Sequence, residues 1–311
     1  MRLLILGAGA TGGYFGGLLA KAGADVTFLV RAKRREQLSR DGLKIESRDG
    51  DVATPVKAIT QDEIAGPFDA VILSPKAYGL ADAIDTVRPA VGEKTFVLPL
   101  LNGMHHLDDL DAAFGKSRVL GGTCHISVVL EPDGRIRHLS PFASLTLGPR
   151  AAEQEEGAKR LHSELARGGF DARYSDNVIG AMWEKWILLA TLAGSTCLMR
   201  ASIGEIVRAN GTQFISGMLD ECCAVAKASS YPPRPAAESG ARTTLTDPKS
   251  NISASMRRDI ERGARIEADH IVGDLISRGR EHAVATPLLN IAYIHLQAYQ
   301  KAFKDAGNGM N

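Results

Sequence analysis

The chain has 311 residues, of which 44% are hydrophobic and 23% are charged, with a net charge of +1. This length allows one large hydrophobic core or two ordinary ones, and the nearly neutral charge argues against nucleic acid or a membrane surface as a partner. The four cysteines, at positions 124, 197, 222 and 223, lack metal-ligand spacing, and no apolar run approaches the length of a membrane span. We therefore expect a reduced, cytoplasmic protein that binds no metal.

The first element is an apolar strand over residues 2–6 that runs directly into a glycine-rich turn. A helical pattern and a second strand, residues 25–30, follow it. In this setting the spacing G-x-G-x-x-G is typical of a dinucleotide-binding turn, in which the glycines allow a tight turn, close approach of a pyrophosphate and helix packing. The alternative is a glycine-rich turn in another α/β fold. The predicted cofactor-binding residues are Gly7, Ala8, Gly9, Ala10, Thr11 and Gly12.

The second strand ends at Arg31, where an NAD-binding protein usually has an acidic residue. A guanidinium binds a phosphate with two hydrogen bonds, so Arg31 favours NADP through its 2′-phosphate. Lys33, Arg34 and Arg35 follow closely, and we interpret them as a solvated helix face.

Strands are next predicted at residues 70–73, 95–101 and 119–130, with a hairpin turn at 132–134 and a further strand at 143–149. From about residue 177 the patterns become helical, over 178–194, 216–230, 255–282 and 286–303, with a loop over 231–251. The predicted class is α/β: a Rossmann-type domain, residues 1–172, followed by an all-α domain, residues 173–311, that carries substrate binding and dimerisation. We expect the substrate site in the cleft between them.

Lys185 lies in a predicted helix that is apolar on every face. A lysine buried there needs a partner or a task, and burial lowers its pKa toward the range useful for proton transfer. The alternative, equally weighted, is a lysine near the helix start that extends its ammonium to water.

Glu267 lies on one stripe of the helix predicted over 255–282, together with Met256, Ile260, Gly263 and Ile271. This stripe faces the core, so the carboxylate points inward and needs a cation or a polar ligand. Lys185 is the natural partner, directly or across a substrate. A structural ion pair is the alternative.

Lys76 and Asn102 each follow a predicted strand of the first domain. Ligands of open α/β sheets bind beyond these strand ends, so both residues are candidates for cofactor and substrate contacts. The alternative for Asn102 is ordinary turn chemistry, since Gly103 follows it.

Taken together, these residues make the chain resemble the ketopantoate reductase family over nearly its whole length. The resemblance rests on GAGATGG with Arg31, on Lys76, on LLNGM, on Trp183-Glu184-Lys185, on Ser255-Met256-x-x-Asp259 with Glu267-x-Asp269, and on Thr286-Pro287. It implies NADPH-dependent reduction of a 2-keto acid to a 2-hydroxy acid, in the best-known case ketopantoate to pantoate on the route to pantothenate.

The resemblance also implies a role for each residue. Lys185 is the general acid, Glu267 holds the substrate hydroxyl and orients Lys185, and Ser255 binds the substrate carboxylate. Asn102 contacts substrate and cofactor, and Lys76 lies beside the nicotinamide.

The chain departs from the family pattern in the helix after the lysine. Leu189 and Ala193 stand where the family commonly has asparagines, and Ile252 stands where an asparagine usually precedes the serine, with Asn251 one position earlier. Losing such hydrogen-bonding groups favours a bulkier or more apolar keto acid or ketone as an alternative substrate. A non-catalytic NADP-binding sensor is the alternative of another class. A homodimer is a further expectation.

Overall fold

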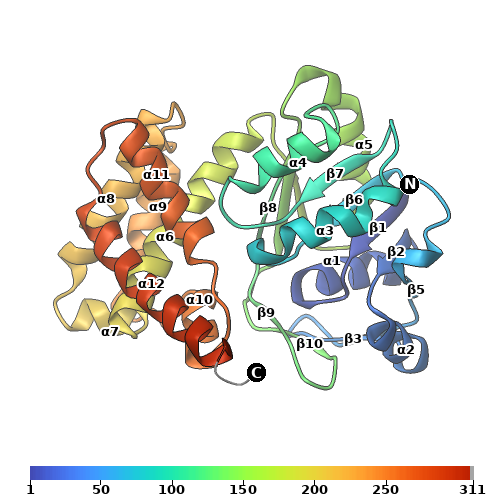
Figure 1. Ribbon diagram of the computed structural model, residues 1–311, viewed down its shortest axis with the longest axis horizontal. Coiled ribbons are helices and arrows are strands. Elements are labelled where there is room, and N and C mark those ends of the chain that lie inside the picture. The colour runs from blue at the N-terminus through green and yellow to red at the C-terminus, as the bar shows by residue number, and fades with distance from the viewer. Residues whose placement is uncertain (309–311) are drawn as a thin grey trace. The chain divides into compact units, whose positions relative to one another are not determined.

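The structure is a computed structural model that describes residues 1–308, with side chains to residue 305. The chain forms two compact units, each described by itself below (Figure 1). The first comprises Met1–Leu101 and His106–Ala181, and the second comprises Asn102–His105 and the chain from Met182 onward. The four-residue excursion 102–105 thus belongs to the helical unit although its sequence neighbours belong to the other.

A parallel five-stranded sheet organises the first unit, in the order β5-β2-β1-β6-β7. Its strands are β1 (Arg2–Leu6), β2 (Asp25–Leu29), β5 (Lys57–Ile59), β6 (Ala70–Leu73) and β7 (Phe96–Pro99). The order of the strands reverses between β1 and β6, which is the position at which open α/β sheets bind ligands. The fold is therefore α/β with a Rossmann-like sheet, as the sequence predicts.

Two smaller sheets accompany the parallel sheet in the same unit. One has the order β4-β3-β10-β9 and the other β12-β11-β8. Their strands are β3 (Leu43–Glu46), β4 (Val52–Thr54), β8 (Gly121–His125), β9 (Val128–Leu130), β10 (Ile136–His138), β11 (Ser144–Gly148) and β12 (Asp171–Tyr174). The predicted hairpin around residues 132–134 is present, because β9 and β10 pair antiparallel.

The helices of this unit are α1 (Ala10–Lys21), α2 (Ala32–Asp41), α3 (Leu80–Val87), α4 (His106–Phe114) and α5 (Glu155–Ala166). The expected domain boundary at residues 172 and 173 falls inside β12, which pairs with β11. The division between the two units lies instead between Ala181 and Met182, inside the next helix.

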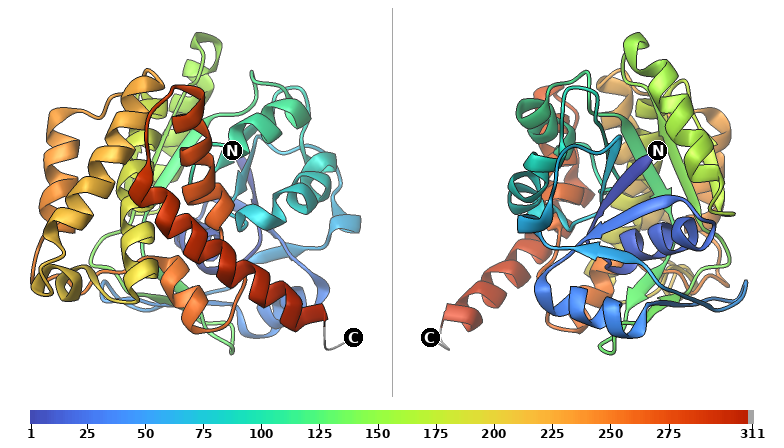
Figure 2. Two further views of the ribbon diagram at one scale, coloured as in Figure 1. Left: turned by 60° about the vertical axis from the view of Figure 1, so that its left-hand side comes forward. Right: turned by 90° about the vertical axis from the view of Figure 1, so that its right-hand side faces the viewer.

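The second unit is built from helices (Figure 1). They are α6 (Val178–Met199, from Met182 onward), α7 (Ile203–Arg208), α8 (Thr212–Ala228), α9 (Pro235–Leu245), α10 (Ser255–Glu261), the π-helix η5 (Asp269–Gly273), α11 (Asp274–Glu281) and α12 (Pro287–Asn308). Helix α12 is one continuous helix that packs on α8 and η5 (Figure 2). Trp183 and Trp186 are both 1% exposed, so α6 supplies the centre of this core.

The loop predicted over residues 231–251 is wrong over 235–245, which form α9. Pro235 begins this helix, where its missing N–H and fixed φ are favourable. Ala241 and Leu245 are buried and supply its apolar side. The high content of proline, serine, threonine and glycine favours a loop by composition, but burial of these apolar side chains stabilises a helix.

The single long helix predicted over residues 255–282 is also wrong. Helix α10 ends at Glu261, and Gly263, two residues later, has a φ of +62°. The amide of Gly263 donates to the carbonyl of Ile260 (3.0 Å) and that of Ala264 to the carbonyl of Asp259 (2.8 Å). These two bonds form a Schellman stop signal, for which glycine is the preferred residue. Residues 264–267 are not helical, and the helical conformation resumes with η5 and α11.

Within residues 1–308, the structure contains no helix both long and apolar enough to cross a membrane.

Candidate functional site

The glycine-rich turn connects β1 to α1 in the first unit. Gly7 has a φ of +84°, and its amide donates to the carbonyl of Leu29 at the end of β2 (2.8 Å). Gly9 precedes the first residue of α1, and no side chain of the described residues caps this helix end. The first amides of α1 are thus available to an anion, and the helix dipole favours one there.

Gly9 and Gly12 have opposite surroundings. A Cβ built on Gly12 would lie 2.8 Å from both the carbonyl oxygen of Gly7 and Oγ of Ser74, so any larger residue would force the helix off the sheet. A Cβ built on Gly9 would meet no atom of the described chain within 4 Å. The open space at Gly9, beside an uncapped helix end, fits a pyrophosphate group.

Arg31 lies two residues beyond β2, directly before α2, and is exposed. Its guanidinium makes no hydrogen bond or ion pair with the part of the chain that the structure describes. Lys33 is exposed as well. Arg31 therefore keeps its donors available at the strand end where the sequence predicts ribose recognition.

Arg34 differs from the solvated residue that the sequence predicts. Its guanidinium donates to the carbonyl of Ala8 in the glycine-rich turn (3.0 Å) and to that of Gly134 in the β9–β10 turn (3.0 Å). Burial lowers its pKa. Arg34 thus ties two turns of this unit together. In the sequence, the position of Arg34 one helical turn after Arg31 is the only hint of a role near the glycine-rich turn. That spacing does not distinguish a buried arginine from a solvated one.

Lys76 follows β6 by three residues and is half-buried in the first unit. It immediately precedes a short 3₁₀ helix, Ala77–Gly79. The sequence therefore placed Lys76 correctly beyond a strand of the parallel sheet, next to the β1–β6 reversal.

In the helical unit, Lys185 and Asn102 meet. The Lys185 ammonium, half-buried on α6, donates to Oδ1 of Asn102 at 2.9 Å. The two residues are 83 positions apart in the chain, and the sequence predicts Glu267 rather than Asn102 as the partner of the lysine. The structure thus adds an amide oxygen that holds the ammonium in place.

Gly103 explains how the segment 102–105 reaches this position. Its φ is +76°, and a Cβ on it would lie 2.7 Å from the carbonyl oxygen of His270 in η5. A residue with a side chain would be strained in φ and would also clash with the π-helix. The glycine after Asn102 is therefore required for a close approach to η5 that fixes Asn102 beside α6.

Glu267 is buried, with 7% of its surface exposed, in agreement with the prediction. The predicted reason, a continuous helical stripe, is wrong, because residues 264–267 are not helical. Its backbone carbonyl accepts a hydrogen bond from the amide of Ile271 (3.0 Å), so Glu267 sits at the entrance of η5.

Ser255 is the first residue of α10 and is half-buried. The amide of Ala254 just before it donates to Oγ1 of Thr196 on α6 (3.2 Å). Thr196 lies 11 positions after Lys185, which is about 16 Å along a helix. The start of α10 is therefore attached to α6 three turns beyond the lysine.

Leu188, Leu189 and Leu192 lie on α6 between these two points and are all half-buried, whereas Ala193 is fully buried. Asn251 is exposed, so its side-chain amide lies outside the interior. Ile252 is exposed as well and has no side-chain amide. After Lys185, the half-buried positions of α6 up to residue 192 are thus all leucines.

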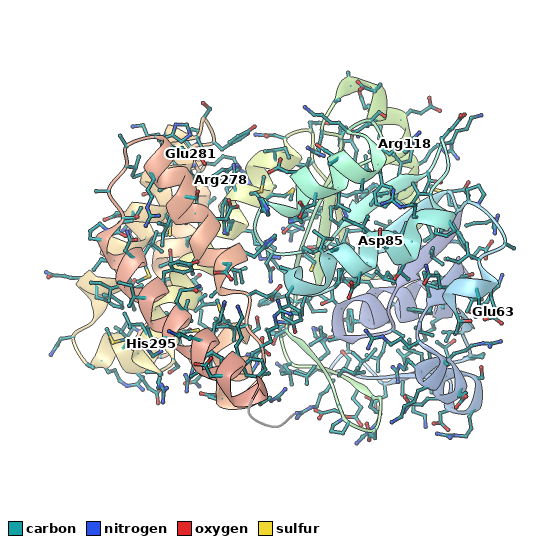
Figure 3. The ribbon with its side chains drawn as sticks, in the orientation of Figure 1. Glu63, Asp85, Arg118, Arg278, Glu281 and His295 are labelled. Atoms are coloured by element: carbon teal, nitrogen blue, oxygen red, sulfur yellow. The ribbon has the colours of Figure 1, made fainter. Side chains whose placement is uncertain are left out.

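Trp186 connects α6 to the π-helix, because its indole Nε1 donates to the carbonyl of Ile271 (2.8 Å). Arg278, which extends from α11 (Figure 3), lies 5.7 Å from the ring centroids of both Trp183 and Trp186. It also pairs with Asp274 on its own helix (3.3 Å). This cation–π contact holds the indoles that align α6 with η5.

Two protein-family models match the chain. The model described as ketopantoate reductase PanE/ApbA matches residues 3–152, and the model of its C-terminal part matches residues 177–300. Apart from residues 102–105, the first match lies within the α/β unit, and the second begins five residues before the helical unit resumes at Met182.

Individual proteins agree with these models. The uncharacterized oxidoreductase YkpB of Bacillus subtilis is 36% identical over 301 residues, which is 96% of this chain and 99% of that protein. The crystal structure of 2-dehydropantoate 2-reductase from Geobacter metallireducens has a TM-score of 0.88 at 28% identity, covering 96% of this chain and 99% of that one. The ternary structure of D-mandelate dehydrogenase with NADH and anilino(oxo)acetate also has a TM-score of 0.88, over 98% and 99% of the two chains, and at 24% identity it is similar in fold.

Proposed function

The chain belongs to the ketopantoate reductase family, and from that premise we propose that it reduces a 2-keto acid to its 2-hydroxy acid with NADPH. The family consists of oxidoreductases that act on CH–OH groups with a nicotinamide cofactor. Within it, 2-dehydropantoate is the first substrate to consider. The observation that carries the proposal is the half-buried Lys185 ammonium on α6, held by Asn102 at 2.9 Å.

The first unit is proposed to bind the cofactor. The amides at the start of α1 and the open space at Gly9 receive the pyrophosphate. Arg31, exposed at the end of β2, binds the 2′-phosphate and selects NADPH over NADH. Lys76, next to the β1–β6 reversal, is assigned to the nicotinamide end. Arg34 supports the turn from behind by holding the carbonyl of Ala8.

NADPH held in this way would supply the hydride that reduces the carbonyl carbon of the substrate. Negative charge then develops on the carbonyl oxygen, and Lys185 gives that oxygen a proton. Asn102 limits the freedom of the ammonium by accepting one of its hydrogen bonds. Such positioning removes much of the entropic cost of proton transfer.

Glu267 and Ser255 are proposed to hold the substrate. A carboxylate that stays buried at the entrance of η5 is suited to accept a hydrogen bond from the substrate hydroxyl. Ser255 begins a helix that is attached to α6 near Thr196, and it is assigned to the substrate carboxylate.

One observation favours a second candidate within the same reaction class. The side of α6 between Lys185 and Thr196 carries Leu188, Leu189 and Leu192, each half-buried, and provides no amide. Burying apolar surface contributes about 25 cal/mol per Å², so a 2-keto acid with a branched or aromatic side chain gains affinity there. A substrate that depends on hydrogen bonds along α6 gains none from these residues.

The test is the rate of NADPH oxidation with ketopantoate and with a series of 2-keto acids of increasing side-chain size. The proposal predicts turnover of at least one of them. The variant Leu189→Asn should shift kcat/KM toward ketopantoate and away from apolar keto acids by roughly tenfold, as expected for one gained hydrogen bond and one lost apolar contact. Leu130→Asn, a leucine exposed on β9, is the control. NADPH binding without turnover of any keto acid would contradict the proposal and favour a non-catalytic sensor.

A further inference from the structure

The segment that carries Glu267 has no helical structure of its own. It runs from Ala264 to Glu267, between the glycine stop of α10 and the start of η5. A short irregular segment gives a buried carboxylate a defined position only when its two ends are fixed. The contacts at those ends therefore decide where the carboxylate of Glu267 lies.

Helix α12 fixes both ends. At the first, the hydroxyl of Tyr299 donates to the carbonyl of Ala264 (2.8 Å). At the second, Asp269 accepts three hydrogen bonds, from Tyr293 Oη (2.6 Å), Gln297 Nε2 (2.6 Å) and Gln300 Nε2 (3.0 Å). All four donors come from one helix over two turns, so the segment is held against a single rigid support.

The other side of the segment is held by α6. The carbonyl of Glu267 accepts from the amide of Ile271, and the carbonyl of Ile271 accepts from the indole of Trp186. Trp186 is the neighbour of Lys185 in the chain. The π-helix is thus the piece through which Glu267 is aligned with the helix of the lysine, and π-helices occur often at functional sites.

We propose that Asp269 is a positioning residue: by holding η5 on α12 it sets the distance between the Glu267 carboxylate and the Lys185 ammonium. This inference rests on the proposed function, in which those two groups act on the substrate. Asp269 itself is exposed and touches neither substrate nor cofactor in this account.

The chemistry of the cluster suits a fixed contact. Burial, and then the hydrogen bond to Asp269, raise the pKa of Tyr293 to about 12. Tyr293 therefore keeps its proton and remains a donor at every pH at which the protein is handled. Hydrogen bonds at an exposed site contribute little net stability, so the expected consequence of losing them is geometric rather than global.

The experiment combines steady-state kinetics on the best 2-keto acid with a double-mutant cycle. Asp269→Ala is expected to lower kcat at least tenfold, with the NADPH dissociation constant unchanged, and Asp269→Asn, which keeps one acceptor oxygen, should recover part of the loss. Glu261→Ala, an exposed acid that pairs with Arg257 on α10, is the matched control and should leave kcat unchanged.

The cycle separates positioning from general stability. If Asp269 acts through Glu267, Asp269→Ala should have little further effect in a Glu267→Gln background. Equal losses of kcat in both backgrounds, or an unchanged kcat for Asp269→Ala, would overturn the role of Asp269 while leaving the reductase proposal intact. A wild type without turnover of any keto acid would instead overturn the proposed function and, with it, this role.

Discussion

At the scale of single residues, the glycines of the first turn show how much of a site the sequence can predict. The spacing of Gly7, Gly9 and Gly12 predicts a turn, an open approach and a close packing contact. The structure gives Gly7 a positive φ, Gly9 open space and Gly12 a contact that leaves no room for a Cβ. Their proposed role in cofactor binding rests on this geometry.

Exchanging these glycines one at a time separates binding from folding. Gly9→Ala places a methyl group where the pyrophosphate is proposed to lie, with a φ of −82° that alanine accepts. It should leave Tm within about 2 °C and raise the NADPH dissociation constant at least tenfold. Gly12→Ala places a methyl 2.8 Å from backbone and side-chain atoms, so it should lower Tm clearly, since overpacking costs about 1–3 kcal/mol. Thermal denaturation and fluorescence titration measure both quantities. Equal Tm losses in the two variants would contradict the assignment.

Arg31 tests the choice of cofactor. A guanidinium bonded to a phosphate contributes about 1.5–3 kcal/mol, so Arg31→Ala should weaken NADPH binding by roughly 10- to 100-fold. NADH lacks the 2′-phosphate, and its affinity should change little. Lys33→Ala, an exposed cation in the first turn of the following helix α2, is the control. Equal losses for NADPH and NADH would show that Arg31 does not read the phosphate.

At the scale of elements, each error of sequence interpretation has a physical cause of its own. Periodicity correctly predicts α6, α8 and α12, because each of them has a long apolar side. It fails for α9, whose sequence has a weak pattern and gains its stability from packing, and for residues 255–282, where one glycine stops the helix. Helix α9 depends on packing contacts with residues elsewhere in the chain. The break after α10 depends on the left-handed conformation of Gly263, which apolar periodicity does not report.

Contacts from α6 stabilise the start of α9, and this can be tested by pH. Burial alone would raise the pKa of Glu184, but the hydrogen bonds and charge of Arg234 lower it overall. The side chain of Arg234 donates to both carboxylate oxygens (2.7 and 2.6 Å), and its backbone amide donates to one of them (3.0 Å). A carboxyl whose pKa is lowered by folding stabilises the fold above its unfolded pKa and loses this contribution as the pH falls through the folded pKa.

Arg234→Ala should therefore lower the free energy of unfolding by about 0.5–1 kcal/mol at pH 7, since the arginine is largely exposed. The difference from wild type should shrink as the pH falls below about 4.5, the ordinary value of the carboxyl group. Urea denaturation at a series of pH values measures it. Arg262→Ala, an exposed arginine after α10, should show no such trend. A difference that stays constant down to pH 3 would contradict the coupling.

At the scale of the whole molecule, the sequence predicts two parts of different class, and the structure has an α/β unit and a helical unit. It does not predict that residues 102–105 join the helical unit, because that depends on a close approach of Gly103 to η5 over a long stretch of chain. The partnership of Lys185 with Asn102 was missed for the same reason. Contacts between distant segments are what a single sequence shows least well. The homodimer stays a prediction.

Ligand linkage tests the assignment of cofactor binding to the first unit. A ligand that binds only the folded state at 100 times its dissociation constant stabilises it by about 2.7 kcal/mol. NADPH should therefore raise the Tm of Lys185→Ala as much as that of the wild type, because Lys185 lies in the other unit. Loss of the shift in this variant would place Lys185 in cofactor binding instead of proton transfer.

The proposed function depends most on Lys185 as the group that protonates the carbonyl oxygen of a 2-keto acid. The most direct measurement is the single-turnover rate of NADPH oxidation, at saturating keto acid, for wild type and Lys185→Ala. Removing a positioned general acid typically lowers the rate about 10²- to 10⁴-fold, so we expect Lys185→Ala to lose activity by that factor and to retain its affinity for NADPH. A single-turnover rate within threefold of wild type would contradict it.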